Sequence, residues 1–192
     1  MPGTRQRRAR AAFAAATLLH VAVAGASEEL WQALQAGGHV VLIRHTSTEA
    51  GTGDPPGFRL DDCSTQRNLS PRGRDEARRI GETFRGRGVP VGEVLASQWC
   101  RCLETARLAF GQAETWPALN SNFNETGRAA PEKNREATTR MAVAPGSGNL
   151  ILVTHQFNIR DLTGEYTAPG EMVVVAPLGE GRFRVRGKLQ AY

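Results

Sequence analysis

The sequence predicts one α/β domain, built as a three-layer α/β/α sandwich with a mostly parallel central sheet and a C-terminal hairpin. Two apolar runs, residues 39–44 and 149–153, lack polar alternation, which is typical of strands buried on both faces of a parallel sheet. Segments with helical spacing of apolar residues lie between such strands. Near the end, two extended runs flank Gly179-Glu180-Gly181, a hairpin pattern. A chain of 192 residues suits a single domain with its own core.

In the first half, apolar spacing predicts a helix over residues 28–35, which stops at Gly37-Gly38 before the strand 39–44. A long polar loop then covers residues 46–68, and loops of that length inside a compact domain are usually functional or disordered. Ser70-Pro71 supplies an N-cap and a first-turn proline for a helix that ends near residue 86.

In the second half, residues 91–96 form the next expected strand, and a helix over residues 102–110 is closed by Gly111. Further elements follow in order: an irregular loop over 116–124, a polar helix over 131–143, a strand over 149–153, a short helix over 158–162 and hairpin strands over 172–176 and 182–188. The sequence shows neither an internal repeat nor a linker, so residues 27–192 are expected to form one domain.

Residues 1–26 have the layout of a secretory signal peptide. Arginines at positions 5, 7, 8 and 10 precede a mostly apolar stretch, and Ala24-Gly25-Ala26 supplies small residues for a peptidase. A mitochondrial transit peptide is a weaker alternative, and Arg7-Arg8 fits a twin-arginine signal poorly. The stretch is too short and too rich in alanine for a stable membrane span. We therefore expect an exported protein, periplasmic or secreted, without a stable membrane span after cleavage.

The charge balance disfavours nucleic acid as a partner. The chain holds 24 basic and 19 acidic residues, a net charge of +5, but four of the arginines lie in the leader. Without them 20 basic residues face 19 acidic ones, so the domain is nearly neutral. A basic stripe for nucleic acid is not supported.

Three cysteines fit one disulfide and one free thiol in an oxidising compartment. We favour a disulfide between Cys63 and Cys100, because both are expected in loops near the candidate site. Cys102 is expected to pack on a helix as a small hydrophobe. The Cys-x-Cys spacing is poor for a metal and no histidine is near in sequence, so no metal site and no cofactor are expected.

A histidine follows each of two expected strands. Residues 40–43 are followed by Arg44-His45, and residues 150–153 are followed by Thr154-His155. Open α/β sheets place their chemistry beyond the carboxyl ends of strands. A neutral His45 is suited to attack phosphorus, while Arg44 can grip two phosphate oxygens. Arg101 is expected at the start of the helix after the second strand. There the partial positive charge of the helix N-terminus adds to the positive potential of the arginine. His155 can donate a hydrogen bond to an equatorial oxygen.

A purely structural role is the alternative for these residues. A lone histidine at a strand end more often bonds a loop carbonyl than performs chemistry. Arg101 alone is as readily a surface ion pair with Glu104, three residues on. The matched pair of histidines with their flanking arginines favours the catalytic interpretation.

Three blocks together resemble the motifs of the histidine phosphatase superfamily, the phosphoglycerate-mutase-like group. They are Val41-Leu42-Ile43-Arg44-His45, then Ser97-Gln98-Trp99-Cys100-Arg101-Cys102-Leu103-Glu104-Thr105-Ala106, then Val153-Thr154-His155. The segment Asn68-Leu69-Ser70-Pro71-Arg72-Gly73-Arg74-Asp75-Glu76-Ala77 resembles a further stretch of that family. The resemblance runs from about His39 to Gly164.

The resemblance implies that His45 is phosphorylated transiently and that Arg44, Arg101 and His155 form the phosphate pocket. It also implies a proton donor about two dozen residues beyond the second arginine, where Glu125 stands, with Asp61 and Asp62 as reserve candidates.

Two positions depart from the family pattern. Thr46 replaces the usual glycine and is a candidate phosphate contact. Gly51 stands where the mutases carry asparagine, which favours hydrolysis over mutase activity. In the long loop, Arg67 is a candidate substrate contact or a structural ion pair.

The leading hypothesis is a metal-independent phosphomonoester hydrolase that acts through phosphohistidine at His45. Its substrate is expected to be a sugar phosphate of the cell envelope or another small organic phosphate, with a phosphoprotein as a further alternative. The alternative is a non-catalytic phosphate-binding or phosphocarrier module of the same fold. A structural envelope protein whose histidines merely pack is a third and weaker option.

Overall fold

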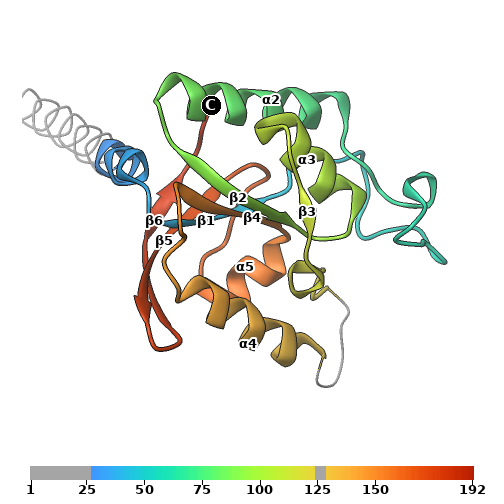
Figure 1. Cartoon of the computed structure of the whole chain (residues 1–192). Coiled ribbons are helices and arrows are strands. Elements are labelled where there is room, and N and C mark those ends of the chain that lie inside the picture. The colour runs from blue at the N-terminus through green and yellow to red at the C-terminus, as the bar shows by residue number, and fades with distance from the viewer. Residues whose placement is uncertain (1–26, 124–128) are drawn as a thin grey trace, which may run out of the picture.

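The computed structural model describes residues 27–123 and 129–192, and in it a six-stranded sheet lies between two layers of helices (Figure 1). The strands are β1 (Val40–Arg44), β2 (Val91–Ala96), β3 (Glu114–Thr115), β4 (Asn149–Thr154), β5 (Met172–Gly179) and β6 (Arg182–Leu189). The helices are residues 27–36, α2 (Pro71–Gly86), α3 (Cys100–Phe110), α4 (Ala129–Met141) and α5 (Gln156–Thr163), with 3-10 turns η1 (Cys63–Thr65) and η2 (Pro117–Leu119). The predicted α/β fold is confirmed.

The strand order places the two histidine-bearing strands side by side. The order is β3-β2-β4-β1-β5-β6, with β1 to β4 parallel and the β5-β6 hairpin antiparallel. Arg44 of β1 is the register partner of Thr154 of β4, so His45 and His155 leave the same edge of the sheet. β2 pairs with the other side of β4, which brings the start of α3 to that edge.

Both faces of the central strands are buried, which explains their unbroken apolar sequence. Ile43 and its alternate neighbours pack under α2 and α3, where Phe84 is fully enclosed. Leu42 and its neighbours face the other way, toward Met141 of α4 and Ile159 of α5. Successive strand side chains point to opposite faces, so each central strand contributes to two core layers.

Several boundaries differ from those expected. α3 begins at Cys100, so Arg101 lies in its first turn, and α5 begins at Gln156, directly after His155, rather than at positions 102 and 158. α4 spans Ala129–Met141 instead of residues 131–143. The two-residue β3 was not predicted, since it pairs only with the last two residues of β2 and carries no periodic signal.

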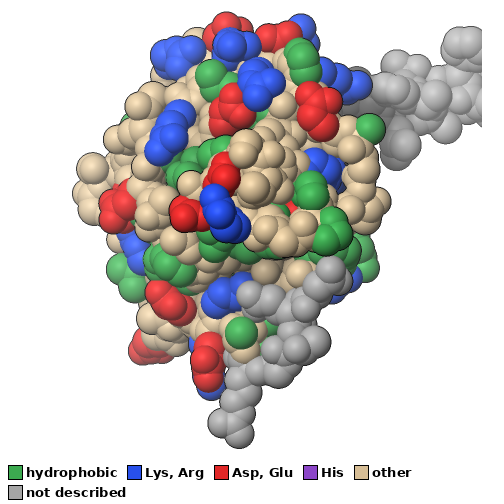
Figure 2. All heavy atoms as spheres, turned by 90° about the vertical axis from the view of Figure 1, so that its right-hand side faces the viewer, with side chains coloured by type: hydrophobic (Ala, Val, Ile, Leu, Met, Phe, Trp, Pro, Cys, Tyr) green, Lys and Arg blue, Asp and Glu red, His purple; other side chains and the backbone are tan. Residues whose placement is uncertain are grey.

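The surface on the side of the long loop is mixed in charge. In Figure 2 basic and acidic side chains are interspersed, without a block of one sign over the drawn face. No helix among the described residues is both long and apolar enough to cross a membrane. The proposed leader, residues 1–26, lies outside the described residues.

Candidate active site

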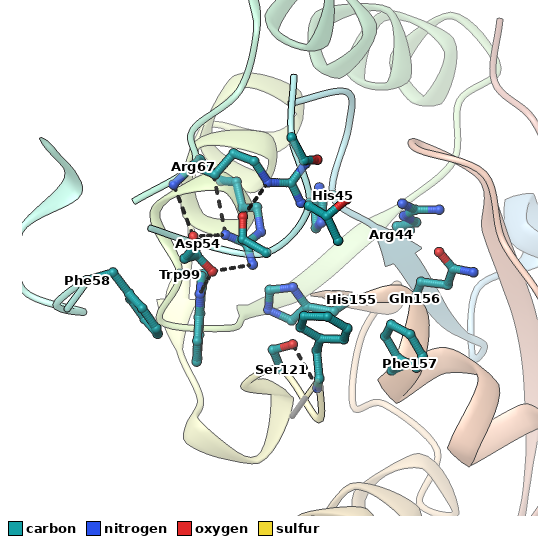
Figure 3. Close-up of a pocket in the computed structure, with 15 residues that line it drawn as sticks. Arg44, His45, Asp54, Phe58, Arg67, Trp99, Ser121, His155, Gln156 and Phe157 are labelled. Carbon is teal, nitrogen blue, oxygen red and sulfur yellow. Dashed lines mark hydrogen bonds and ion pairs between the residues drawn. The ribbon is translucent and has the colours of Figure 1, made fainter. Parts of the chain in front are cut away.

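A pocket of about 600 Å³ opens beyond the carboxyl ends of β1 and β4 (Figure 3). It gathers three arginines, both strand-end histidines, one carboxylate and four aromatic side chains. The lining residues are Arg44, His45, Gly51, Thr52, Gly53, Asp54, Phe58, Arg67, Trp99, Arg101, Ser121, Phe123, His155, Gln156 and Phe157. The sequence-predicted residues Arg44, His45, Arg67, Arg101 and His155 are therefore brought together.

His45 is held as a neutral imidazole with a defined tautomer. Its Nδ1 lies 2.9 Å from the carbonyl oxygen of Thr46. A carbonyl only accepts, so Nδ1 carries the proton and Nε2 keeps its lone pair. Burial, followed by the positive charge of Arg101, lowers the pKa of His45 to about 3. The ring is therefore an unprotonated nucleophile at any working pH.

The segment after His45 is clamped against the first turn of α2. Ser47 donates its N–H to Glu76 at 2.9 Å, and its carbonyl accepts from the Ser70 N–H at 3.0 Å. A Cβ on Gly73 would lie 1.8 Å from the Ser47 oxygen, so only glycine permits this approach. The clamp fixes the backbone that orients His45.

Two guanidinium groups beside His45 have unused donors. Arg44 donates to the Thr167 carbonyl at 2.6 Å, yet its Nε is buried without a hydrogen-bond partner in the described structure. The same holds for Nε of Arg101. Burying an N–H of a charged group unpaired is costly, and an anion in the pocket would relieve that cost.

Asp54 holds Arg101 in place. Its oxygens accept from the two terminal nitrogens of Arg101 at 2.7 and 3.2 Å, and from the Trp99 indole at 2.9 Å. Burial acts to raise the pKa of Asp54, but hydrogen bonds from Arg101, the Arg67 backbone and Trp99 outweigh it and lower the pKa. Asp54 is therefore a fixed carboxylate and an unsuitable proton donor.

Arg67 ties the long loop together while lining the pocket. Its guanidinium donates to the carbonyls of Gly53 and Gly51 at 2.8 and 3.0 Å, and to the Thr48 hydroxyl at 2.6 Å. Its backbone N–H donates to Asp54 at 3.0 Å. Burial and the charge of Arg101 lower the pKa of Arg67. The side chain thus braces the loop, and its charge adds to the positive field of the pocket.

His155 faces His45 and is anchored from behind. The two rings meet edge to face with centroids 5.4 Å apart. Nε2 of His155 lies 2.9 Å from the Ser97 hydroxyl, which itself sits 3.3 Å from Asn120 Oδ1. Burial, then the proximity of His45, keeps the pKa of His155 well below its ordinary value. Ser97 thus fixes the ring orientation of His155.

The cysteines adopt the predicted arrangement. Cys63 and Cys100 form a disulfide that joins the long loop to the first residue of α3. Cys102 is the free thiol, buried in the core beneath α3. The disulfide therefore fixes the loop carrying Asp54 beside Arg101.

Other sequence-predicted residues do not reach the pocket. The side chain of Thr46 is fully buried, and its hydroxyl lies 3.2 Å from that of Thr105 instead of facing the phosphate position. Asp61 and Asp62 pair with Arg59 at the loop surface. Glu125 lies outside the described residues.

The considered ion pair between Arg101 and Glu104 does not form. Arg101 is buried against Asp54, and Glu104 instead accepts from Arg74 at 2.6 Å.

Sequence reasoning missed Asp54, Ser97 and the aromatic lining. Ser97 lies directly after β2, within one of the motifs that resemble the family. That position could have identified it as a site residue. Asp54 lies in the long irregular loop over residues 46–68, where spacing predicts no contacts. The aromatic residues at 58, 99, 123 and 157 come from four separate segments, so only folding unites them.

The chain is similar to known phosphatases. A family model described as histidine phosphatase superfamily, branch 1, matches residues 40–130. No curated protein sequence matches significantly. The structure of the protein histidine phosphatase SixA with tungstate is 18% identical, with 80% of this chain and 97% of that one covered and a TM-score of 0.53.

Two further solved structures share the fold. An alpha-ribazole phosphatase from Shigella flexneri is 17% identical, covering 77% of this chain and 94% of its own, with a TM-score of 0.57. A phosphoserine phosphatase from Entamoeba histolytica, in complex with 3-phosphoglyceric acid, is 13% identical, covering 80% and 98%, with a TM-score of 0.56. At these identities the likeness shows the fold alone. Over residues 40–130, a little under half of the chain, the sequence is similar to the histidine phosphatase superfamily, branch 1.

Proposed function

We propose that this protein is an exported, metal-independent hydrolase of small organic phosphomonoesters, with His45 as the nucleophile. One observation carries the proposal. Nε of Arg44 and Nε of Arg101 are buried donors without partners in the described structure, and they flank a histidine whose pKa is about 3. A phosphate dianion supplies the missing acceptors, and the unprotonated ring supplies the attacking lone pair.

In the first step Nε2 of His45 bonds to phosphorus as the ester oxygen departs with its electron pair. The Nδ1 proton stays on the ring, where it is held by the Thr46 carbonyl at 2.9 Å. In the second step water attacks the phosphohistidine, the N–P bond breaks and inorganic phosphate leaves. The ring returns to its starting state, so His45 turns over without loss.

The charge that spreads over the phosphoryl oxygens is met by the arginines and His155. Arg44, Arg67 and Arg101 bring three positive charges and Asp54 one negative charge to the pocket lining. The Ser97 hydroxyl, which donates to Asn120 Oδ1 at 3.3 Å, lies 2.9 Å from Nε2 of His155 and holds that ring beside the pocket. Such fixed donors stabilise charge without reorganising.

The proton for the leaving oxygen is assigned, as a prediction, to Glu125. The support is its distance in sequence from Arg101 and the unsuitability of Asp54, whose pKa is lowered. Glu125→Gln should slow hydrolysis of esters with poor leaving groups more than of esters with good ones.

The nucleophile is tested with a matched pair of histidine variants. His39 stands at the opposite end of the same strand region, where its Nδ1 contacts the Gly37 carbonyl. His45→Ala should abolish hydrolysis of phenyl phosphate and glycerol phosphate together with covalent phosphoryl labelling, whereas His39→Ala should retain both. Full activity of His45→Ala would sink the mechanism. Stoichiometric labelling of the wild type without release of phosphate would instead favour the phosphocarrier alternative.

Export is supported by the composition of residues 1–26 and by the disulfide between Cys63 and Cys100, because disulfides persist in oxidising compartments. Expression of the full chain in a Gram-negative host, followed by fractionation and N-terminal mass analysis, tests it. We expect a processed form beginning near residue 27 in the periplasm. A full-length product retained in the cytoplasm would contradict export.

A further inference from the structure

An aromatic wall runs from the catalytic histidines to the mouth of the pocket. Trp99 meets His155 edge to face with centroids 5.4 Å apart. Phe58 in turn lies 5.6 Å from Trp99. The three rings follow one another along this side of the pocket, with Asp54 accepting from the Trp99 indole at 2.9 Å.

A second aromatic pair forms the opposite wall. Phe123 and Phe157 pack with centroids 5.3 Å apart. Figure 3 shows Phe157 on one side of His155, with Trp99 and Phe58 on the other. A Cβ on Gly53 would lie 3.5 Å from the Phe123 ring, so that ring reaches across to the long loop. The two pairs bound a slot above the phosphate pocket.

Two rings of the slot are partly exposed to solvent. Phe58 is 36% exposed and Phe123 39% exposed, although large aromatic side chains are usually well buried. Apart from the cations, the histidines and Asp54, the side-chain polar groups of the lining are those of Thr52, Ser121 and Gln156. The Asp54 carboxylate is already engaged by Arg101 and Trp99, so it is not available to a sugar hydroxyl.

We propose that the substrate is an aryl phosphate, a monoester whose phosphate is attached directly to a planar aromatic ring. This inference rests on the proposed function and names its substrate class. The ring would lie between the Phe58–Trp99 pair and the Phe123–Phe157 pair, in offset or edge contact with them. The volume of about 600 Å³ is ample for one ring and a phosphoryl group.

The chemistry of an aryl ester matches the site. Nε2 of His45 bonds to phosphorus, the bond between phosphorus and the aryl oxygen breaks, and the electron pair leaves on a phenolate. A phenol such as that of tyrosine has a pKa of about 10, so its anion leaves with less help from an acid than an alkoxide needs. Water then cleaves the phosphohistidine, and the phenolate takes up a proton.

Recognition must be tested apart from intrinsic reactivity, because aryl esters hydrolyse readily in any active site. Phenylphosphonate, cyclohexylphosphonate and methylphosphonate keep the charged head group but have no bond to hydrolyse. All three are tested as competitive inhibitors of the wild-type enzyme. We expect the inhibition constant of phenylphosphonate to be about tenfold lower than those of the other two. The double variant Phe58→Leu/Phe123→Leu, which keeps apolar volume but removes two rings, should reduce that preference to about threefold or less.

A matched control uses an exposed hydrophobic residue outside the pocket. Leu178, near the end of β5, is exposed and absent from the lining, so Leu178→Ala should keep the full preference for the phenyl compound. Equal inhibition by all three phosphonates, or tighter binding of the cyclohexyl one, would overturn the proposal. So would a lower KM for a sugar phosphate or a 5′-nucleotide than for phenyl phosphate.

These failures are distinguishable from failure of the proposed function. In each of these outcomes the wild type still hydrolyses a monoester and His45→Ala does not. Such a result supports the phosphohistidine mechanism and contradicts only the aryl phosphate as substrate. If no monoester is hydrolysed and His45 takes up no phosphoryl group, the proposed function itself falls.

Discussion

Asp54 binds the two terminal nitrogens of Arg101 and leaves Nε of the same guanidinium without a partner among the described residues. Both side chains are buried, at 8% and 5% exposure. The carboxylate therefore orients the arginine from one end, while Nε on the other edge is buried without an acceptor. A positioning role for Asp54 follows, and this residue was not identified by sequence reasoning.

The first prediction concerns Asp54→Asn. Removing one partner of a buried ion pair leaves an uncompensated charge, which costs about 3–5 kcal/mol of unfolding free energy. We expect that loss in urea denaturation without anions. Saturating inorganic phosphate should restore more stability to the variant than to the wild type, because it neutralises Arg101 in the folded state alone.

Asp61 provides the control for that experiment. It lies in the same loop, but its side chain is 85% exposed and its contact with Arg59 is 3.6 Å long. Asp61→Asn should leave both stability and the response to phosphate unchanged, since exposed ion pairs contribute little. Equal stability of the two variants without phosphate would contradict the role given to Asp54.

The second prediction concerns Ser97, which lies 2.9 Å from Nε2 of His155. Ser97→Ala frees that ring to rotate and should lower kcat about tenfold, equivalent to about 1.4 kcal/mol, with little change in KM. Ser97→Thr retains the hydroxyl and should recover most of the loss. A rise in KM with kcat unchanged would argue against a role in orienting His155.

The third prediction concerns the disulfide, which joins two cysteines separated by 37 positions in the sequence. Loop-closure entropy for such a length stabilises the folded state by about 3–4 kcal/mol. Reduction of the wild type should lower its unfolding free energy by that order and also lower activity, because Cys63 tethers to α3 the long loop, residues 46–68, that carries Asp54. The variant Cys63→Ser/Cys100→Ser should start at the lower stability and show no further response to reductant. A response of equal size in that variant would implicate something other than this disulfide.

The fourth prediction concerns pH. Burial is the main cause of the lowered pKa values of His45, about 3, and of His155. Below the ordinary histidine pKa of about 6.5 the unfolded chain binds protons on these rings that the folded state does not. Stability is therefore fully present above that value and is lost as pH falls toward the folded pKa.

Between pH 7.5 and 5.5 the expected loss is about 1.4 kcal/mol for each of the two histidines, measured by urea denaturation. The lowered carboxyl pKa values of Asp54 and Glu76 act mainly below that window, so they do not obscure the effect. The double variant His45→Gln/His155→Gln should lose less over the same interval. A pH-independent unfolding free energy of the wild type would contradict neutral buried rings.

Much of the fold was predictable because burial leaves a periodic trace in sequence. Residues 40–43 of β1 and 150–153 of β4 are all apolar, since each face of each strand meets a core layer. The hairpin was marked by glycines around Glu180, which adopts a positive φ of 52°. β3 left no such trace, because two residues at a sheet edge are too few to show a period.

The sequence likewise predicted some features of the site and missed others. Arg44, His45, Arg101 and His155 follow strand ends or open a helix, so topology alone brings them to one edge of the sheet. Thr46 follows a strand end too, but its hydroxyl turns inward to Thr105 because the backbone is clamped by α2. A strand end thus predicts the location of a residue and not the direction of its side chain.

By itself the sequence determined most of the strands and helices along the chain and the cationic histidine edge, since each rests on local periodicity or on residue type at a strand end. It also favoured the pairing of Cys63 with Cys100, because both were expected in loops near the candidate site. The tertiary structure decided which atoms are available: Nε2 rather than Nδ1 of His45, and Nε rather than the terminal nitrogens of Arg101. It also decided that aromatic rings from four distant segments line the approach to them. Such contacts depend on the positions of irregular loops in space, and no repeat in the sequence encodes them.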